Sequence, residues 1–233
     1  MSTKQFDLII PVLNEAEALP GFFSRLQKLQ LNCQPIFINN ASTDNSLDLI
    51  NDYPGAIVIN HNTNEGYGSS IIDGIAASKN DVIVIIDVDG EYPPECIPVL
   101  LEALRINDIV YASRFLHSQI ESNPDISWPK KLGNQLITHL FNQLFHQNIT
   151  DLYTGCKAIK RSCLLDIHLQ QNGFEHVLEL SAKLAARNYK IAEIPVYYQR
   201  RRTGKSKMHH IPETVKYFYW LLRYARQLRA GKL

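Results

Sequence analysis

The sequence has no run of 18 apolar residues, about the length that a membrane-spanning helix needs. It also shows no secretory signal segment, because the five residues before Phe6 lead directly into a strand-like run. The four cysteines have none of the spacings of zinc sites and suit the reduced thiols of a cytoplasmic protein. There is no internal repeat and no low-complexity stretch. We therefore expect a cytoplasmic protein of one large domain with at most a small appendage.

Acidic residues are nearly absent from the C-terminal segment. Residues 200–233 hold ten Lys or Arg and one acid, Glu213, whereas the remainder holds 14 basic and 22 acidic residues. The tail therefore carries a net charge of +9 and the remainder a net charge of −8. Such a split indicates an anionic partner for the tail: phosphate, a lipid surface or nucleic acid.

Residues 208–233 are predicted to form a basic amphipathic helix after a domain that spans residues 1–207. The apolar stripe of this helix consists of Ile211, Val215, Phe218, Leu222 and Ala225, widened by Tyr217, Leu221, Tyr224 and Leu228. Aromatic rings among basic residues suit the headgroup level of a membrane, so the protein is expected to be peripheral on the inner membrane face. The alternative is packing on its own domain or on a second subunit of a homo-oligomer. Nucleic acid is not expected, because the rings lie on a helix and not on a sheet platform.

Strand-like and helix-like segments alternate over most of the chain. The expected strands are residues 6–12, 35–39, 56–60, 82–87, 109–112 and 191–198, and the expected helices are residues 19–29, 46–51, 69–78, 94–105, 130–145, 173–187 and 211–229. This order predicts an α/β fold with a mostly parallel central sheet flanked by helices on both faces. Residues 115–129 are polar and are predicted to form a mobile loop.

Two carboxylates, Asp87 and Asp89, directly follow the Val/Ile run at residues 82–86. Such a run is typical of a strand buried on both faces, so the carboxylates are expected at the carboxyl end of a central strand, where open α/β sheets bind ligands. Neighbouring carboxylates repel unless a cation joins them, and oxygen ligands suit Mg²⁺ or Mn²⁺ carrying a diphosphate. A turn that caps the next helix is an equal alternative from this segment alone.

The loop after the first strand, Pro11–Glu15, has no glycine-rich turn. This absence argues against a dinucleotide-binding protein, a P-loop protein and a nucleotidyltransferase. Polar side chains at residues 39–46 can instead read a base or a ribose, and the glycines within residues 62–70 allow close backbone approach. Taken singly, each of these segments is equally an ordinary turn or helix cap.

Taken together and in this order, several motifs resemble glycosyltransferase family 2, and within it the dolichol-phosphate mannosyltransferase type of polyprenyl-phosphate glycosyltransferases. The motifs are Pro11-x-x-Asn14-Glu15, Ala41-Ser42-Thr43-Asp44-x-Ser46, Asn64-x-Gly66-Tyr67-Gly68, Asp87-x-Asp89-Gly90-x-Tyr92-Pro93-Pro94 and Gly204-x-Ser206-Lys207. The resemblance covers about residues 6–207. It implies the GT-A fold, with a Rossmann-like nucleotide-binding half and an acceptor half. It also implies a nucleotide-sugar donor, Mg²⁺ or Mn²⁺, and inversion at the anomeric carbon.

The resemblance also implies roles for individual residues. Asp89 would ligate the metal together with Glu91, and Arg114 would face acceptor phosphate. The implied donor-binding residues are Pro11, Asn14, Glu15, Asn40, Ser42, Asp44, Asn64, Gly66, Gly68, Asp87, Val88 and Lys207. The implied catalytic residues are Asp87, Asp89, Arg114, Asp151, Glu179 and Arg201.

The chain departs from the family pattern in three places. The family usually has an Asp at the position of Asn39 or Asn40; an amide offers a donor as well as an acceptor, so the base preference stays open. Many relatives carry a Glu-Asp pair as general base where this chain has Glu175-His176. The two transmembrane helices that follow the catalytic domain in many bacterial relatives are missing from this sequence.

We therefore expect a metal-dependent inverting glycosyltransferase of cell-envelope glycan biosynthesis with a polyprenyl phosphate as acceptor. A phosphate is already anionic and needs no general base, which fits the missing Glu-Asp pair. The first alternative is transfer to a sugar hydroxyl, for which Asp151, Glu175 or Glu179 could act as base. The second is a non-catalytic scaffold that binds a nucleotide or lipid; the presence of the aspartates at 87 and 89 and of Arg201 argues against it.

Overall fold

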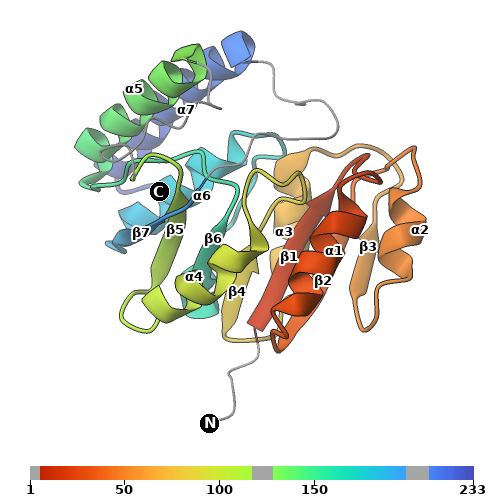
Figure 1. Cartoon of the computed structure of the whole chain (residues 1–233). Helices are drawn as coiled ribbons and strands as arrows, with labels where there is room; N and C mark the ends of the chain where they lie inside the picture. The colour runs from red at the N-terminus through yellow and green to blue at the C-terminus, as the bar shows by residue number, and fades with distance from the viewer. Residues whose placement is uncertain (1–5, 117–127, 198–209) are drawn as a thin grey trace.

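A computed structural model describes residues 6–116, 128–197 and 210–233 of the chain. Within these residues, seven strands form one mixed sheet in the order β3-β2-β1-β4-β6-β5-β7 (Figure 1). The strands are β1 (Phe6–Val12), β2 (Cys33–Asn39), β3 (Ile57–Asn60), β4 (Val82–Ile85), β5 (Ile109–Ser113), β6 (Lys157–Lys160) and β7 (Ile191–Pro195). The helices are α1 (Leu19–Lys28), α2 (Ser46–Asn51), α3 (Tyr67–Ala77), α4 (Ile97–Ala103), α5 (Trp128–Phe145), α6 (His176–Ala186) and α7 (His210–Arg229), with 3₁₀ turns η1 (Pro94–Cys96) and η2 (Arg161–Leu164).

The central strands are buried on both faces, as their Val/Ile runs predict. On β1, Leu8 and Ile10 point into one apolar layer and Ile9 into the other, and all three are fully buried. Helices α1, α2 and α4 supply the first layer, and helices α3, α5, α6 and α7 supply the second (Figure 1). β1 pairs in parallel with β2 and β4, and β2 with β3, so the carboxyl ends of these strands meet at one edge of the sheet.

β6 is an antiparallel strand between β4 and β5 that the sequence analysis did not predict. Its four residues, Lys157–Lys160, are too few to show a period, although Ala158 and Ile159 are fully buried. Because Ile85 pairs with Lys157, the start of β6 lies beside the end of β4. β4 itself ends at Ile85 and not at Asp87, so the predicted aspartates lie in the loop that follows the strand.

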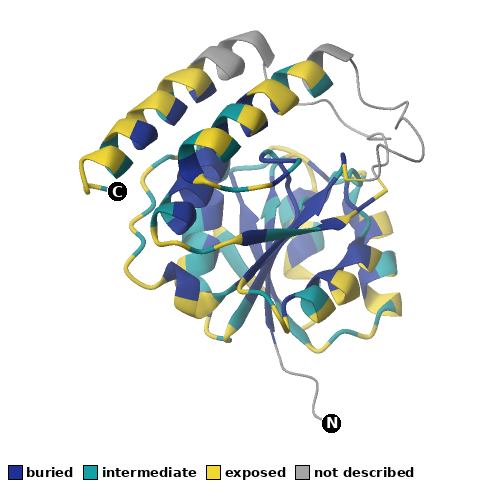
Figure 2. Cartoon of the chain, turned by 90° about the vertical axis from the view of Figure 1, so that its left-hand side faces the viewer, coloured by how far each residue is buried: buried dark blue, intermediate teal, exposed yellow. Residues whose placement is uncertain are grey.

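α7 packs against α5 and α6, which agrees with the alternative that this helix packs on its own domain. Tyr217, Leu221 and Tyr224 are buried, whereas Phe218, Tyr219 and Leu222 are 45%, 58% and 38% exposed. Figure 2 shows this division along the two adjacent helices α5 and α7. In the described parts of the chain, no helix has the length and apolar character needed to cross a membrane.

Gly74 lets α3 lie directly on the sheet, since a Cβ there would lie 2.5 Å from Cγ2 of Ile9 and 3.1 Å from Cδ1 of Ile38. Gly74→Ala is therefore expected to lower the free energy of unfolding by about 1–3 kcal/mol, the usual cost of overpacking a core. Gly21→Ala in α1 is the matched control, because a Cβ there meets nothing within 4 Å. It is expected to raise stability by up to about 1 kcal/mol through helix propensity. Urea unfolding measures both; equal effects of the two substitutions would contradict this packing.

Candidate functional site

The loops after β1 and β2 are joined by hydrogen bonds from predicted donor-binding residues. The backbone N–H of Asn14 donates to Oγ of Ser42 at 3.0 Å, and Oδ1 of Asn14 accepts from the N–H of Thr43 at 2.7 Å. Asp44 accepts from the N–H of Ala16 at 3.1 Å. Asn14 has a left-handed backbone with a φ of 51°, a conformation that Asn adopts more readily than most residues. The predicted residues are thus brought together, and their own contacts shape the rim of the site.

Asn40 is buried and connects the loops after β2 and β3. Its Nδ2 donates to Oδ1 of Asn64 at 2.9 Å, and its Oδ1 accepts from the N–H of Glu65 at 2.8 Å. Nδ1 of His61 lies 3.1 Å from the same Oδ1. Of these, Asn40 and Asn64 were predicted to bind the donor and His61 was not. A single His after a short strand belongs to no recognisable motif, so the sequence does not predict that His61 lies beside Asn40. That contact depends on the tertiary structure.

Gly66 and Gly68 meet the chain's own backbone at residues 171–173. A Cβ on Gly66 would lie 2.2 Å from the carbonyl oxygen of Asn172, and a Cβ on Gly68 would lie 2.0 Å from that of Gln171. The N–H of Gly68 donates to the Asn172 carbonyl at 2.7 Å. The close backbone approach expected from these glycines is therefore present, but the segment that approaches belongs to the protein.

Asp87 lies in a tight pocket just beyond β4. Tyr67 donates its hydroxyl hydrogen to Oδ1 of Asp87 at 3.1 Å, and a Cβ on Gly155 would lie 2.0 Å from Oδ2. Burial, followed by the charges of Asp89 and Glu91, raises the pKa of Asp87 to about 8. This environment favours the neutral carboxyl unless a cation is nearby.

Asp89 and Glu91 form the rest of an acidic cluster, here the carboxylates of Asp87, Asp89 and Glu91. Oδ1 of Asp89 accepts from the N–H of Glu91 at 2.9 Å, across Gly90 with its left-handed φ of 80°. Three carboxylates within five residues, one of them buried with a raised pKa, are a donor set that a hard divalent cation would stabilise. In the chemistry of their oxygen ligands, these residues suit Mg²⁺ or Mn²⁺.

Lys157 is a buried cation beside this cluster that the sequence analysis did not assign to the site. It is 2% exposed, and its Nζ lies 4.8 Å from the ring centroid of Tyr111. Burial lowers the pKa of Lys157 to about 8, although Asp87 acts in the opposite direction. The burial of Lys157 follows from β6, which was not predicted.

Arg114, directly after β5, forms a bidentate ion pair with Asp151. Nε of Arg114 lies 2.7 Å from Oδ2 of Asp151, and Nη2 lies 2.9 Å from Oδ1. Asn134 of α5 also donates to Oδ1 at 2.8 Å. Nη1 of Arg114 lies 3.9 Å from the carboxylate of Glu91, so the guanidinium adjoins the acidic cluster. Burial alone would raise the pKa of Asp151, but Arg114 outweighs it and holds that pKa below its usual value.

Glu179 of α6 is fully buried and accepts hydrogen bonds from the loop that precedes this helix. It accepts from the N–H groups of Gln170 and Gln171, at 2.9 and 2.8 Å, and from Nζ of Lys183 at 2.7 Å. The structure thus places Glu179 behind the 171–173 segment that packs on Gly66 and Gly68. The neighbouring His176 has both ring nitrogens buried without a hydrogen-bond partner among the described residues, and burial lowers its pKa to about 3.

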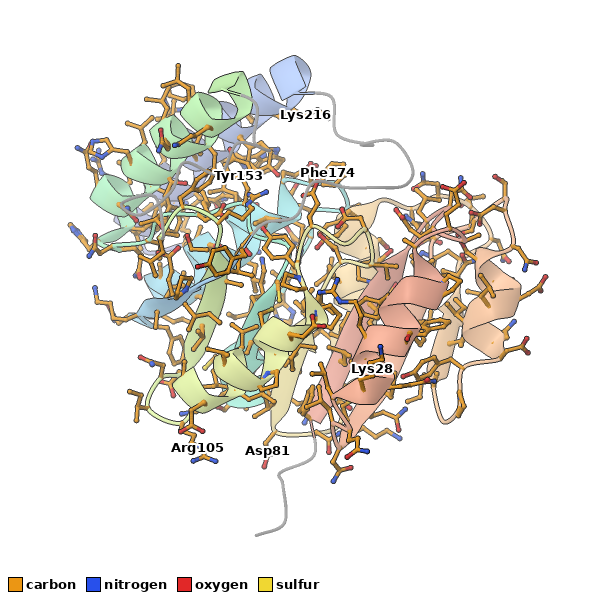
Figure 3. The ribbon with its side chains drawn as sticks, viewed as in Figure 1. Lys28, Asp81, Arg105, Tyr153, Phe174 and Lys216 are labelled. Atoms are coloured by element: carbon orange, nitrogen blue, oxygen red, sulfur yellow. The ribbon has the colours of Figure 1, made fainter. Side chains whose placement is uncertain are left out.

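Phe174 links this loop to the acidic cluster and to α7. Its ring stacks on Tyr67 at 5.5 Å between centroids, and its carbonyl accepts from the hydroxyl of Tyr217. Figure 3 shows Phe174 and Tyr153 at the end of the molecule where α5 and α7 lie, with Asp81 and Arg105 at the other end. Tyr67 and Phe174 are further residues of the site that the motifs alone did not identify as such.

The remaining predicted site residues lie near the strand ends or outside the described residues. Pro11 belongs to β1, Glu15 begins the turn before α1, and Val88 is buried between the two aspartates. Arg201 and Lys207 fall outside the described residues.

Comparison with known proteins identifies the family. The sequence profile described as "Glycosyl transferase family 2" matches residues 7–167. Undecaprenyl-phosphate mannosyltransferase of Micrococcus luteus is 28% identical, over 86% of this chain and 86% of its own length. Dolichol-phosphate mannosyltransferase of Pyrococcus furiosus is 29% identical, over 95% of this chain; this chain spans 64% of that protein.

Solved structures with the same fold include two sugar–phosphoglycerate synthases. Mannosyl-3-phosphoglycerate synthase of Rubrobacter xylanophilus has a TM-score of 0.69 at 16% identity, covering 99% of this chain and 76% of that one. Glucosyl-3-phosphoglycerate synthase of Mycobacterium tuberculosis, crystallised with Mn²⁺ and UDP, has a TM-score of 0.65 at 18% identity. The match covers 98% of this chain and 78% of that one. The agreement confirms the predicted GT-A fold.

Asp87 is expected to destabilise the metal-free protein at neutral and alkaline pH. A carboxyl with a pKa of about 8 in the folded chain and 3.8 as its ordinary value contributes stability at low pH that is lost as the pH rises towards 8. Asp87→Asn removes this titration, so its Tm in EDTA should exceed that of the parent protein at pH 8, and the difference should shrink towards pH 4. Each kcal/mol of difference in the free energy of unfolding corresponds to a shift in Tm of about 2–4 °C in a chain of this size.

Asp52→Asn, at an exposed carboxylate after α2, is the control and should change Tm little at either pH. A lower Tm for Asp87→Asn at pH 8 would show that the carboxylate is stabilised by the fold, contrary to this environment.

Proposed function

The chain belongs to glycosyl transferase family 2, and on this basis we propose that it transfers a sugar from a nucleoside diphosphate sugar to a polyprenyl phosphate, with inversion at the anomeric carbon. The observation that carries the proposal is the juxtaposition of the acidic cluster and the Arg114–Asp151 pair at one edge of the sheet. One side offers oxygen ligands for a metal-bound diphosphate, and the other offers a cation for an acceptor phosphate. The names of the two mannosyltransferase relatives support a lipid phosphate as acceptor.

The donor is proposed to lie over the loops after β1, β2 and β3. Asn14, Ser42 and Asp44 hold the first two loops together, and Asn40 and Asn64 hold the second to the third. Preorganised loops of this kind leave little ordering cost to the binding of a nucleoside. A divalent cation held by Asp89 and Glu91 would neutralise charge on the leaving diphosphate. Arg201 and Lys207 are proposed to contact the same diphosphate.

The acceptor is proposed to be a phosphate because the buried acids near the site are already engaged. Both oxygens of Asp151 bind Arg114, and both oxygens of Glu179 bind backbone N–H groups. Neither carboxylate is placed to take a proton from a sugar hydroxyl. A phosphate oxygen needs no such base: it attacks the anomeric carbon from the face opposite the diphosphate, and the bond from that carbon to the diphosphate oxygen breaks.

Arg114 is proposed to orient the attacking phosphate. Its guanidinium is fixed by Asp151 and lies 5.7 Å from the ring centroid of Tyr92, so it has little freedom to lose on binding. A planar guanidinium suits the paired oxygens of a phosphate. The carboxylate of Glu91, 3.9 Å from Nη1, connects this side of the site to the acidic cluster.

A transfer assay with labelled nucleotide sugars and a short polyprenyl phosphate tests the function. Turnover is expected with at least one donor, and both EDTA and Asp89→Asn should reduce it by at least 100-fold, because the charge on the leaving group then lacks its counter-ion. Asp52→Asn is the control and should keep at least half of the activity. Glu175→Gln should also retain activity, since no base is needed.

Two outcomes of this assay would contradict the proposal. Undiminished turnover in EDTA would exclude the metal. Transfer only to sugar hydroxyls, with loss of activity in Glu175→Gln, would favour the hydroxyl-acceptor alternative.

We further propose that α5 and α7 rest on the membrane that holds such an acceptor. Leu132 and Leu136 on α5 and Phe218 and Leu222 on α7 are each between 38% and 54% exposed, and basic residues accompany them on α7. The two helices are adjacent, and each carries exposed residues along its length (Figure 2). Each Lys or Arg near an anionic surface contributes about 1 kcal/mol, which salt screens.

Vesicle co-sedimentation checks the membrane contact. Anionic vesicles should bind the protein at low salt and release it at high salt, and neutral vesicles should bind it weakly. Phe218→Ser/Leu222→Ser should lose most of the binding without unfolding, because both side chains lie outside the core. Ile106→Ser, at an 89% exposed apolar residue in the α4–β5 loop, is the control and should bind normally. No binding of the parent protein at low salt would rule this surface out.

A further inference from the structure

A cavity of about 250 Å³ opens between α6, α7 and residues 166–171. None of its lining residues belongs to the acidic cluster or to the Arg114–Asp151 pair. Part of its wall comes from residues 166–171 and part from Lys183 of α6 and the C-cap residue Arg187. The rest comes from the C-terminal half of α7 and residues 232–233. The cavity is therefore a feature separate from the candidate glycosyltransferase site.

The lining of the cavity is strongly cationic. It includes Lys183, Arg187, Arg223 and Lys232, against a single acidic side chain, Asp166. The charge of Lys183 is balanced by Glu179, at 2.7 Å. Arg187, Arg223 and Lys232 remain against the carboxylate of Asp166 and the terminal carboxylate of Leu233, so the cavity keeps an excess of positive charge. Two of these residues, Arg223 and Lys232, come from the basic tail, whose charge the proposed function accounts for only in part.

Two guanidinium groups are held in place on different walls. Arg187, the C-cap residue of α6, donates from Nη2 to the carbonyl of Asp166 at 2.8 Å and from Nη1 to the carbonyl of Lys183 at 3.3 Å. Arg223 of α7 lies over the ring of Trp220, with Cζ 4.7 Å from the ring centroid. These contacts use two of the five N–H groups of Arg187 and the face of Arg223, and a guanidinium offers its N–H groups along its edges. Both side chains line the cavity, and their remaining N–H groups are donors for an anion bound there.

We propose that this cavity binds a phosphate group carried by a small molecule or a lipid headgroup. Fixed guanidinium groups recognise the oxygens of a phosphate through paired, charge-assisted hydrogen bonds. The volume of about 250 Å³ suits a phosphate with a small attached group and is below the usual size of a site for a drug-sized ligand. The indole of Trp220 supplies an apolar wall for the attached group. This site does not depend on the proposed transferase function.

Trp220 offers a direct readout of binding. The sequence has two tryptophans, so Trp128→Phe leaves Trp220 as the single indole reporter. Fluorescence is titrated with glycerol 3-phosphate and with inorganic phosphate, in EDTA, so that metal-dependent binding at the acidic cluster does not contribute. A saturable change is expected. Arg187→Gln/Lys232→Gln in the same background should weaken the apparent Kd at least tenfold.

The matched control removes the same charge from the same region. Arg226→Gln/Arg229→Gln changes two exposed residues of α7 that do not line the cavity, and its apparent Kd should stay within twofold of the parent value. Thermal melts check that both double variants fold. Equal weakening in the two double variants would mean that only the overall charge acts, and it would overturn the site.

Vesicles separate the two sources of phosphate. A saturable response to glycerol 3-phosphate identifies a soluble ligand, whereas a response only to phosphatidylglycerol vesicles, lost in Arg187→Gln/Lys232→Gln, identifies a lipid headgroup. Either result supports the cavity. No response to any of these probes up to about 10 mM phosphate would overturn it, and so would a response to vesicles alone that the double variant retains.

Discussion

The repulsion among Asp87, Asp89 and Glu91 is the constraint around which the centre of the molecule is organised. The fold holds Asp87 in a pocket formed by Gly155 and the hydroxyl of Tyr67, with the buried Lys157 nearby. A carboxyl placed in this way is poorly stabilised by the protein alone. Electrostatic repulsion therefore destabilises the site without a metal, and a bound cation would relieve it. Enzymes commonly give up some stability in this way at their functional sites.

The segment from Gln170 to Phe174 connects regions that are far apart in sequence. On one side, its carbonyls meet Gly66 and Gly68; on the other, its N–H groups bind Glu179. Phe174 then stacks on Tyr67, which in turn contacts Asp87, and accepts from Tyr217 of α7. The helix pair α5–α7 and the acidic cluster thus share a common support. A displacement of α7 would act on Tyr67 through two contacts, the Tyr217–Phe174 hydrogen bond and the Phe174–Tyr67 ring stack.

Much of this architecture was predictable because its signals are local. The Val/Ile runs of β1 and β4 require burial on both faces, and the polar residues after each strand follow from the parallel order. β6 was missed because four residues with lysines at both ends show no pattern, and only its partners in β4 and β5 make it a strand. Because β6 was not predicted, the burial of Lys157 was not predicted either. The motifs indicated Gly66 and Gly68 correctly as points of close approach, but they contain nothing about residues 171–173, whose contact with them depends on tertiary structure.

The position of β6 has a consequence for the order in which the protein assembles during synthesis. The β1–β2 and β2–β3 pairs join strands that are near neighbours in the sequence, so the loops that carry Asn14, Asn40 and Asn64 can form once the first part of the chain has emerged from the ribosome. Ile85, by contrast, pairs with Lys157, and Gly155 closes the pocket of Asp87. Residues 155–157 leave the ribosome long after Asp87, so these contacts form late in synthesis. A nascent chain would therefore present Asp87 and its neighbours to solvent until β6 is inserted, and the loops after β1, β2 and β3 would form before the acidic pocket does.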